Sequence, residues 1–335
     1  MARPVSLVTG GAGFIGSHLV DELIAMGHEV VALDDLSGGL RENVNGAAHF
    51  VEGSCTDAPL VGRIFEEHGF DFVYHLAAYA AEGLSHFIRR FNYTNNVIGS
   101  VNIINASVNH GVRCLVFTSS IAVYGAGQTP MSESLVPMPE DPYGIGKYAI
   151  ELDLAAARKM FGLEYVVFRP HNVYGPRQNT GDRYRNVIGI FMNQMLAGKP
   201  LTIFGDGTQS RAFTDVSDVV PTMARSAENP DAFGEVFNIG SERVYSVNEL
   251  AELVQQAAGR SAEVSHLTAR NEVLHAFSDH TKAARRLGYA PTVHLRDGLA
   301  RMFAAVREVG PRESPPFRGI EIERNLPQSW RDYVG

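Results

Sequence analysis

The sequence contains little cysteine, with only Cys55 and Cys114 among its 335 residues. Two cysteines can build neither a disulfide framework nor a tetrahedral cysteine metal site, so we expect both to be reduced and buried. Basic residues are also in the minority, with 29 Lys and Arg against 37 Asp and Glu and a formal net charge of −8. This balance argues against a nucleic-acid-coating protein, which needs clustered positive charge, although a local basic patch can still hold a small anion.

The sequence also lacks a long apolar run. Its longest uncharged stretch, Cys114 to Ser132, holds hydroxyl side chains, two glycines and a proline, and is too polar to cross a bilayer. The N-terminal residues lead directly into a β-like segment without the apolar core of a signal peptide, so a cytoplasmic location is expected. The length allows one large domain or two.

The first half of the chain alternates short β-branched runs with segments of helical periodicity. Such alternation requires right-handed crossovers and predicts a doubly wound parallel α/β sheet. After Arg169 the alternation becomes irregular, and the proline-rich final segment is expected to wrap the surface without adding a core element. Strands are expected at 5–9, 29–33, 49–51, 72–76, 115–118, 165–168 and 236–239, and helices at 14–26, about 91–108, 247–258 and 278–287.

A glycine-rich turn follows the first expected strand directly. Gly11, Gly13 and Gly16 have Gly-x-Gly-x-x-Gly spacing and precede a helix, whose N-terminal N–H groups suit a pyrophosphate. Asp34 ends the second strand, where its carboxylate can accept hydrogen bonds from both adenosine ribose hydroxyls and repel a 2′-phosphate. This arrangement favours NAD over NADP. The structural alternative is a tight turn followed by a solvated acidic loop at Asp34 and Asp35.

A tyrosine and a lysine one helical turn apart indicate acid–base chemistry. Tyr143 and Lys147 share one face of an expected helix, and an ammonium beside a phenol lowers the pKa of the phenol toward a range useful for proton removal. Thr118, Ser119 and Ser120 lie at the carboxyl end of a strand, the edge where open α/β sheets bind ligands. Either feature alone is common on protein surfaces, but their combination in this order is specific.

Together these features resemble the extended short-chain dehydrogenase/reductases of the NAD-dependent epimerase/dehydratase family, and in particular the UDP-glucose 4-epimerases. The resemblance runs from about residue 5 to 287 and includes the segment 120–125, which is similar to the Ser-x-x-Val-Tyr-Gly motif of the family. It implies a Rossmann-like sheet with a smaller α/β C-terminal substrate-binding lobe. The expected NAD-binding domain comprises 1–180 and 213–242, and the expected nucleotide-sugar-binding domain comprises 181–212 and 243–335.

The resemblance also implies roles for individual residues. The implied catalytic triad is Ser120, Tyr143 and Lys147. The residues implied to bind NAD are Gly10, Gly13, Phe14, Ile15, Gly16, Asp34, Asp35, Leu76, Ala77, Ala78, Asn96, Tyr143 and Lys147, with His75 beside them. The residues implied to bind a UDP-sugar are Ser120, Tyr143, Asn172, Asn186, Val187, Thr202, Ile203, Phe204, Arg211, Arg270 and Glu272. No metal is expected, and a homodimer through the helices near 91–108 and 148–161 is implied.

Two positions discriminate among members of the family. Related dehydratases have Asp-Glu after the hydroxyl residue and decarboxylases have a Glu before Val-Tyr-Gly, whereas this chain has Ile121 and Ala122. Because neither can carry a proton, we expect C4 epimerisation through a transient 4-keto sugar with tightly held NAD. The small Ala276 suggests that UDP-GlcNAc and UDP-GalNAc are accepted as well as, or instead of, UDP-glucose and UDP-galactose.

Several alternatives remain open from the sequence. A UDP-glucuronate 4-epimerase is possible because Arg177, Arg183 and Arg185 could meet a carboxylate, as is another NAD-dependent nucleotide-sugar enzyme or a non-enzymatic NAD-binding regulatory protein. Some positions depart from the family pattern: Ser54 stands where an Asp commonly contacts adenine, and Ala269 stands where a second phosphate arginine is usual. Glu82 is either a substrate contact or a loop carboxylate.

Overall fold

The computed structural model describes residues 3–182, 184–269, 273–313 and 317–331. Its centre is a parallel seven-stranded sheet of order β11-β6-β5-β4-β1-β2-β3. The order reverses between β1 and β4, which creates a crevice at the carboxyl ends of the strands. The predicted Rossmann-like doubly wound fold is confirmed. The strands are β1 (Val5–Thr9), β2 (Glu29–Asp34), β3 (His49–Glu52), β4 (Phe72–His75), β5 (Cys114–Thr118), β6 (Tyr165–Pro170) and β11 (Glu235–Ile239).

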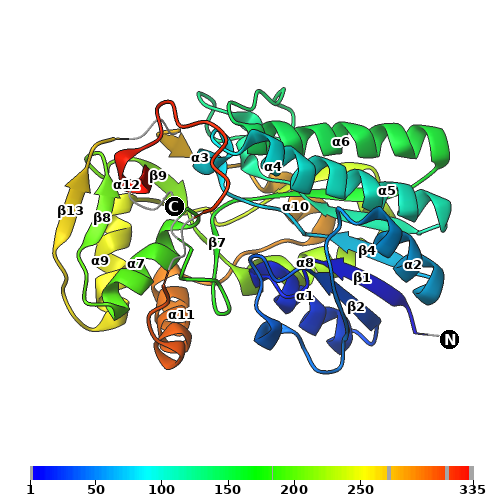
Figure 1. Ribbon diagram of the computed structural model, residues 1–335, viewed down its shortest axis with the longest axis horizontal. Helices are drawn as coiled ribbons and strands as arrows, with labels where there is room; N and C mark the ends of the chain where they lie inside the picture. The colour runs from blue at the N-terminus through cyan, green and yellow to red at the C-terminus, as the bar shows by residue number, and fades with distance from the viewer. Residues whose placement is uncertain (1–2, 183, 270–272, 314–316, 332–335) are drawn as a thin grey trace.

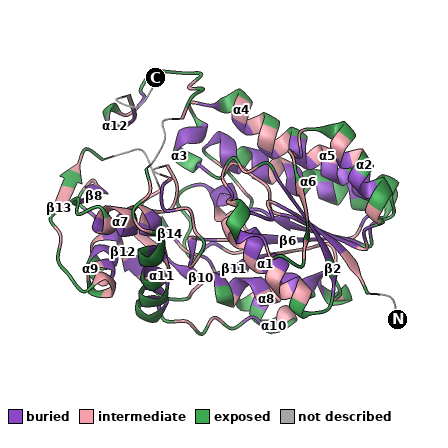
Figure 2. Cartoon of the chain, turned by 60° about the horizontal axis from the view of Figure 1, so that its bottom comes forward, coloured by how far each residue is buried: buried purple, intermediate pink, exposed green. Residues whose placement is uncertain are grey.

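Helices cover both faces of this sheet (Figure 1). One face packs against α1 (Phe14–Ala25) and α8 (Val216–Ser226), and the other against α2 (Ala58–His68), α5 (Gly99–Asn109) and α6 (Pro142–Phe161). Successive residues of a strand alternate between the two cores, as Leu7 and Val8 do. Both cysteines are free and buried, as expected. Figure 2 shows that the middle strands of the sheet are buried and that the helices bury one side, whereas the edge strand β3 is only partly buried.

The helix expected at 91–108 is interrupted. It consists of α4 (Arg89–Tyr93), a π-helical turn η2 (Thr94–Ile98) and α5. The π turn places the buried Asn96 so that its Oδ1 accepts from Tyr79 N at 2.7 Å and its Nδ2 donates to Tyr79 O at 3.1 Å. Such turns occur frequently at functional sites. Asn96 therefore fixes the chain that follows β4, which includes α3 (Glu82–Ser85).

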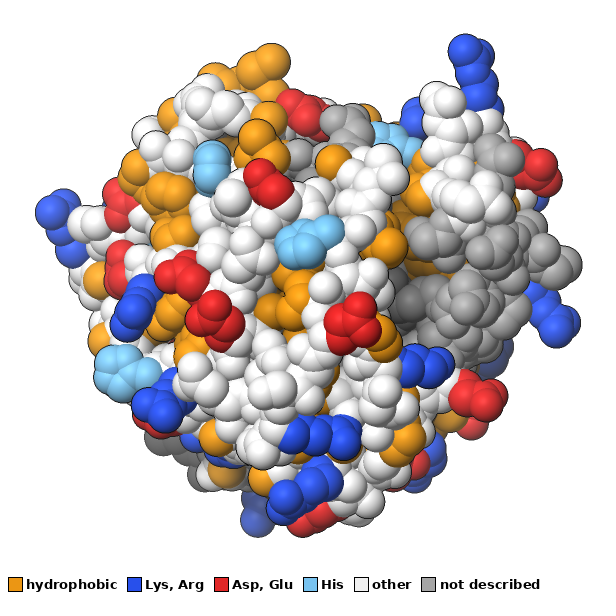
Figure 3. Space-filling view, turned by 90° about the vertical axis from the view of Figure 1, so that its left-hand side faces the viewer, with side chains coloured by type: hydrophobic (Ala, Val, Ile, Leu, Met, Phe, Trp, Pro, Cys, Tyr) orange, Lys and Arg blue, Asp and Glu red, His pale blue; other side chains and the backbone are white. Residues whose placement is uncertain are grey.

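A smaller lobe lies beyond the carboxyl ends of the central strands. Its core lies among α7 (Val187–Leu196), α9 (Val247–Ala258) and α11 (Leu295–Val309). The helix α11 was not expected, although Leu295, Leu299 and Met302 follow a helical period. Acidic and basic side chains are interspersed over the outer end of this lobe (Figure 3). Its strands are β8 (Leu201–Phe204), β9 (Ser210–Ala212), β12 (Val244–Ser246), β13 (Val264–Leu267) and β14 (His275–Ala276).

The remaining short elements lie between the longer ones along the chain. They are η1 (Arg41–Asn43), the 3₁₀ turn η3 (Ile121–Tyr124), β7 (Val173–Tyr174), β10 (Thr214–Asp215), η4 (Pro230–Ala232) and α10 (Thr281–Leu287). The strand β7 pairs with β10 in parallel, so the chain enters and leaves the smaller lobe side by side. Within the described ranges, no helix has both the length and the apolar character of a membrane span.

The C-terminal segment corrects one expectation. The prolines do prevent long regular elements, but the segment still contributes a buried cluster rather than an irregular surface wrap. Leu326 and Trp330, the latter on α12 (Gln328–Arg331), pack with Leu84 and Ile88 of the larger lobe. Figure 1 shows this segment in red, running between the two lobes. Apolar side chains on a proline-rich segment can bury area without regular structure, and composition alone did not distinguish the two outcomes.

Candidate active site

A single cleft of about 2190 Å³ runs along the carboxyl edge of the sheet and into the smaller lobe. At one end it is lined by the glycine-rich turn, in the middle by Ser120, Tyr143 and Lys147, and at the far end by Phe204 and Arg211. The structure thus brings the expected cofactor, catalytic and substrate residues together along one surface. Among the described residues, no group of three or more His, Cys, Asp or Glu side chains is arranged to hold a metal.

The glycine-rich turn is shaped by contacts that leave no room for side chains. Gly10 has a φ of +70°, and a Cβ there would lie 2.9 Å from Ala77 N. A Cβ on Gly16 would collide with the carbonyl oxygen of Gly10. Because these positions carry only hydrogen, backbone N–H groups at the N-terminus of α1 are exposed to the cleft and can approach a pyrophosphate closely. Gly13, Phe14 and Ile15 line the same wall.

Asp34 lies at the end of β2 and supports the turn. Its Oδ2 accepts from Ala12 N at 3.0 Å and its Oδ1 accepts from Leu36 N at 2.8 Å. Burial raises the pKa of Asp34, and these backbone hydrogen bonds oppose the rise. A carboxylate has about four acceptor sites, so the side chain can still accept from ribose hydroxyls. Asp35 and Ser54 also line this end.

The segment after β4 forms the floor beside the turn. Leu76, Ala77 and Ala78 line the cleft, as expected. His75 instead lies beneath it, fully buried between Thr9 Oγ1 at 2.7 Å and Ser100 Oγ at 2.8 Å. Asn96 likewise lies behind the floor, where its side chain hydrogen-bonds the backbone of Tyr79. His75 and Asn96 therefore support the floor of the cleft from behind and do not line it.

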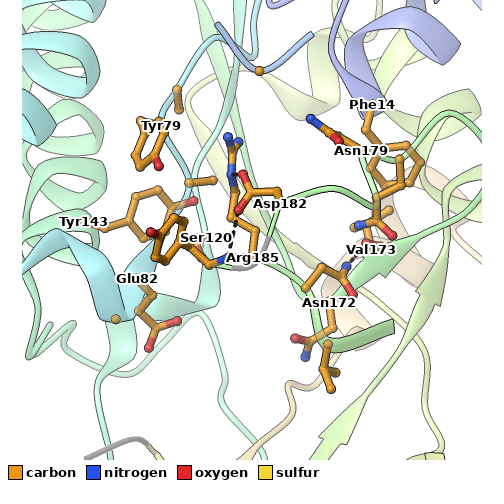
Figure 4. Close-up of a pocket in the computed structure, with 18 of the residues that line it drawn as sticks. Phe14, Tyr79, Glu82, Ser120, Tyr143, Asn172, Val173, Asn179, Asp182 and Arg185 are labelled. Carbon is orange, nitrogen blue, oxygen red and sulfur yellow. Dashed lines mark hydrogen bonds and ion pairs between the residues drawn. The ribbon is translucent and has the colours of Figure 1, made fainter. Parts of the chain in front are cut away.

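The catalytic candidates meet at the start of α6. Asp141 caps this helix by accepting from Gly144 N at 2.9 Å, which places Tyr143 and then Lys147 on the face toward β5. Lys147 Nζ donates to Thr118 O at 2.7 Å and lies 5.8 Å from the centroid of the Tyr143 ring. Ser120, which caps η3, extends from the end of β5 toward Tyr143 (Figure 4).

Burial dominates the electrostatics of this group. It raises the pKa of Tyr143 above its usual value, opposite to the direction expected from the sequence, while Ser120 and Arg185 oppose the rise. Lys147 Nζ donates its hydrogen bond to the carbonyl of Thr118 rather than to the phenol. Its attraction for the phenolate form of Tyr143 therefore does not outweigh the loss of hydration of that form on burial. Burial also lowers the pKa of Lys147 to about 7, against the attraction of Glu151.

The substrate side is built from side chains on strained loops. Asn172, with a φ of 43°, donates from Nδ2 to Ala212 O at 3.1 Å. Asn186, with a φ of 37°, caps α7 and donates to Val173 O at 2.7 Å. Asparagine tolerates this conformation better than most residues. Val187, Thr202, Ile203 and Phe204 continue the wall, and Thr202 hydrogen-bonds Gln194.

Arg211 lies at the far end of the cleft on β9. Its Nη1 donates to Ser210 O at 2.9 Å and to Leu274 O at 2.8 Å, and its Nη2 donates to Val273 O. These carbonyls orient the guanidinium. Its planar fork of N–H donors is a shape suited to two phosphate oxygens. Two further expected substrate residues, Arg270 and Glu272, lie outside the described residues.

Three observations bear on the sugar. Ala276 is buried with Val123 and Met131 and does not line the cleft. Its small side chain therefore does not create the room beside the sugar that we expected for an N-acetyl group. Glu82 does line the cleft, at the start of α3. It lies on the same side as Tyr143 (Figure 4), and its negative charge raises the pKa of that phenol.

The sequence indicated Arg185 only as a partner for a hexuronate carboxylate, and it did not indicate Tyr79, Asp182 or Trp330 for this wall. Arg185 lies over the ring of Tyr79 at 4.7 Å, with its Nε donating to Asp182 Oδ2 at 2.5 Å. Figure 4 shows these three side chains beside Ser120 and Tyr143. Trp330 also lines the cleft, close to Gly83. The sequence signal for Trp330 was the presence of a single tryptophan near the end of a proline-rich segment. No pattern within the segments that hold Arg185 and Tyr79 indicated that these two side chains would meet.

The sequence model of the NAD dependent epimerase/dehydratase family matches residues 6–240. The chain belongs to this family. It is 39% identical over 304 residues to a UDP-glucose 4-epimerase of Mycolicibacterium smegmatis, covering 88% of this chain and 96% of that protein. A UDP-glucose 4-epimerase from Thermotoga maritima, solved with UDP-glucose, has a TM-score of 0.88 and 39% identity, covering 91% of this chain and 99% of its own. A UDP-glucuronic acid 4-epimerase from Bacillus cereus, solved with UDP-glucuronic acid and NAD, has a TM-score of 0.84 and 31% identity, covering 91% of this chain and 99% of its own.

The cofactor of this family member is NAD, as the sequence predicted. The residues present fit it, because the close backbone packing at Gly10 and Gly16 leaves N–H groups facing the cleft and Asp34 keeps acceptor capacity there. The glycine turn and Asp34 would hold the adenosine and pyrophosphate parts. Lys147 would hold the nicotinamide ribose near Tyr143.

Proposed function

We propose that the protein catalyses C4 epimerisation of a UDP-sugar with retained NAD. The supporting observation is the cleft that joins the glycine turn, Tyr143 with Ser120, and Arg211 along one surface. Ile121 and Ala122 occupy the turn directly after Ser120 and offer no acid or base for elimination or decarboxylation. The two-lobe division expected from the sequence is proposed with it: a cofactor domain of 1–180 and 213–242 and a substrate domain of 181–212 and 243–335.

The residues support the following sequence of proton movements. In its phenolate form, Tyr143 Oη removes the proton of the C4 hydroxyl and becomes the neutral phenol, and Ser120 orients the same oxygen by hydrogen bonding. NAD, when bound, would supply the acceptor and then the donor of the C4 hydride. When the 4-keto sugar has turned its opposite face, Tyr143 gives the proton back. Acid–base catalysis of this kind contributes about 10²–10⁴-fold to the rate.

Arginine pairing bears on the hexuronate alternative. Arg177 pairs with Asp21 at 2.7 Å, and Arg185 pairs with Asp182. A guanidinium already bound to a carboxylate offers less attraction to the carboxylate of a hexuronic acid. Arg183 lies outside the described residues. A neutral hexose or N-acetylhexosamine is therefore the favoured substrate class.

The direct test is an NMR assay of the purified protein against UDP-glucose, UDP-GlcNAc, UDP-glucuronate and dTDP-glucose. Epimerisation predicts a C4 epimer with no net NADH, no CO₂ and no deuterium at C5 when the reaction runs in D₂O. Appearance of CO₂ or of a 4-keto-6-deoxy sugar would assign the protein to decarboxylation or dehydration instead. Binding without any product would favour a regulatory role.

Two variants distinguish epimerisation that uses Tyr143 alone from an elimination that also uses Glu82. Tyr143→Phe removes the proton carrier, so turnover should fall about 10²–10⁴-fold while NAD stays bound. Glu82→Gln removes the carboxylate beside Tyr143. An epimerase that uses Tyr143 alone should keep most of its kcat in that variant, whereas an elimination that draws on Glu82 should lose it.

A homodimer through α5 and α6 is part of this proposal. Ile98, Leu152, Met160 and Phe161 expose 52%, 55%, 75% and 64% of their surface on or beside these helices. Exposed apolar groups on neighbouring helices are suited to a partner of the same kind. Sedimentation equilibrium should give twice the chain mass, and Leu152→Glu should give a monomer. A wild-type monomer would refute the dimer.

A further inference from the structure

A buried ion pair lies directly behind the catalytic candidates. Glu151 follows Lys147 by one turn of α6, just as Lys147 follows Tyr143, so the three side chains share one helix face. Glu151 is 6% exposed, and Arg169 on β6 is 4% exposed. The Arg169 Nε donates to Glu151 Oε1 at 2.9 Å and the Nη2 donates to Oε2.

The pair is tied to the strand end that carries the catalytic serine. Ser119 Oγ donates to Glu151 Oε1, and Ser119 N donates to Phe168 O at 2.7 Å. Ser120 is the next residue and caps η3. Glu151 thus accepts three hydrogen bonds, two from Arg169 on β6 and one from Ser119 just after β5, and fixes the backbone from which Ser120 extends.

A buried ion pair is a costly way to hold a fold together. Desolvation of both charges consumes much of their attraction, and apolar residues of similar volume often serve as well. A pair in this position needs a further reason. Lys147 supplies this reason, because it is 3% exposed and, within the described part of the chain, its ammonium donates directly only to a neutral carbonyl, Thr118 O.

We propose that Glu151, held in place by Arg169, is a positioning residue: its carboxylate supplies the negative charge that lets the buried Lys147 act as a cation beside Tyr143. This inference rests on the proposed function for its catalytic meaning. The charged and titratable groups that face Lys147 are Tyr143 and Glu151 on α6, His75 on β4, and Arg169 behind Glu151 on β6. Of these, Glu151 is the group whose negative charge favours the ammonium form of Lys147. Burial lowers the pKa of Lys147 to about 7, so a modest loss of attraction changes its charge near neutral pH.

The test measures Lys147 directly. The lysines of this chain are Lys147, Lys159, Lys199 and Lys282, so protein labelled with ¹³C-lysine gives few ε-carbon signals, and Lys147→Arg identifies the one of interest. In Glu151→Gln, the pKa of Lys147 should fall by about one unit, and the alkaline limb of kcat should move to lower pH by the same amount. Glu151→Asp should restore much of both.

Arg169 left unpaired by Glu151→Gln could prevent folding, so the double variant Glu151→Gln with Arg169→Met removes both charges. It should fold and still show the lowered pKa of Lys147. Glu235→Gln is the matched control, since it breaks the pair with Lys282 at 2.8 Å on the edge strand β11 and should move neither readout. An unchanged titration of Lys147 in the folded double variant would overturn the proposal, as would a lowered pKa with an unmoved kcat profile. If the wild-type protein turns over no UDP-sugar, the proposed function fails, and the lysine titration still decides the role of Glu151.

Discussion

The two ends of the cleft are built in different ways. At the cofactor end, backbone forms the surface, since the turn from Gly10 to Gly16 excludes side chains and exposes N–H groups. At the substrate end, side chains form the surface, and they extend from non-glycine residues with positive φ such as Asn172 and Asn186. A surface of backbone is fixed by local spacing, whereas a surface of side chains depends on which distant segments meet.

The largest expected effect tests the cofactor end. Gly16→Ala places a Cβ against the carbonyl oxygen of Gly10, so the turn must shift. We expect the free energy of NAD binding to weaken by about 3 kcal/mol, which raises the Kd for NAD roughly 100-fold. The measurement is the amount of NAD released by acid from the purified protein.

Gly62→Ala is the matched control for this substitution. Gly62 lies within α2, and a Cβ there meets nothing within 4 Å. Retention of NAD in both variants would mean that the close packing of the turn does not govern binding.

This contrast explains how much could be predicted from the sequence. The sheet, the glycine turn, Asp34 and the Tyr143–Lys147 pair follow from spacing within single segments, and the structure brings them together. The positions of Arg185 over Tyr79 and of Trp330 beside Gly83 result from contacts between segments far apart in the chain. No periodicity encodes such contacts.

Ala276 illustrates the same limit in reverse. Its place three residues before Asp279 suggested a role beside the sugar, but β14 pairs with β9 in a register that buries Ala276 with Val123 and Met131. In a strand, a shift of one residue moves a side chain to the opposite face. Counting along the sequence could not determine which face it takes.

A second prediction tests the substrate end. Arg211→Ala removes a guanidinium that backbone carbonyls orient, and charge-assisted hydrogen bonds to a phosphate should be lost. We expect the binding free energy of the UDP-sugar to weaken by about 2 kcal/mol, which raises its KM roughly thirtyfold, and the NAD content to stay unchanged. Arg243→Ala is the control, since Arg243 lies in the same lobe over the ring of Tyr245 and does not line the cleft. Loss of NAD in Arg211→Ala would contradict the separation of the two ends.

A third prediction concerns a feature that the two ends share. Burial lowers the pKa of His75, beneath the cofactor floor, and of His171, beside Asn172, from 6.5 to about 3. Both imidazoles stay neutral in the folded protein while the unfolded chain takes up protons below pH 6.5. Stability from each histidine is therefore full above pH 6.5 and falls as the pH drops, by about 1.4 kcal/mol per histidine at pH 5.5.

Urea unfolding at pH 7.5 and 5.5 measures this loss. His171→Gln should reduce the difference between the two pH values by about 1.4 kcal/mol, whatever its effect on absolute stability. The exposed His110→Gln is the control and should leave the difference unchanged. Equal pH dependence in wild type and His171→Gln would mean that this histidine is not a buried neutral group.

The smallest expected effect concerns selectivity between plain and N-acetylated sugars. Because Ala276 faces the buried cluster and not the cleft, Ala276→Ser should change the ratio of kcat/KM for UDP-GlcNAc and UDP-glucose by less than about twofold, well under the 1–3 kcal/mol of a real pocket contact. Ala276→Tyr overfills the cluster at a cost of about 1–3 kcal/mol in stability and should lower both activities together. Paired assays of both substrates with each variant provide the measurement. A selective loss of UDP-GlcNAc turnover in Ala276→Tyr would return Ala276 to the sugar site and would show that the register of β14 in the working enzyme differs from its register here.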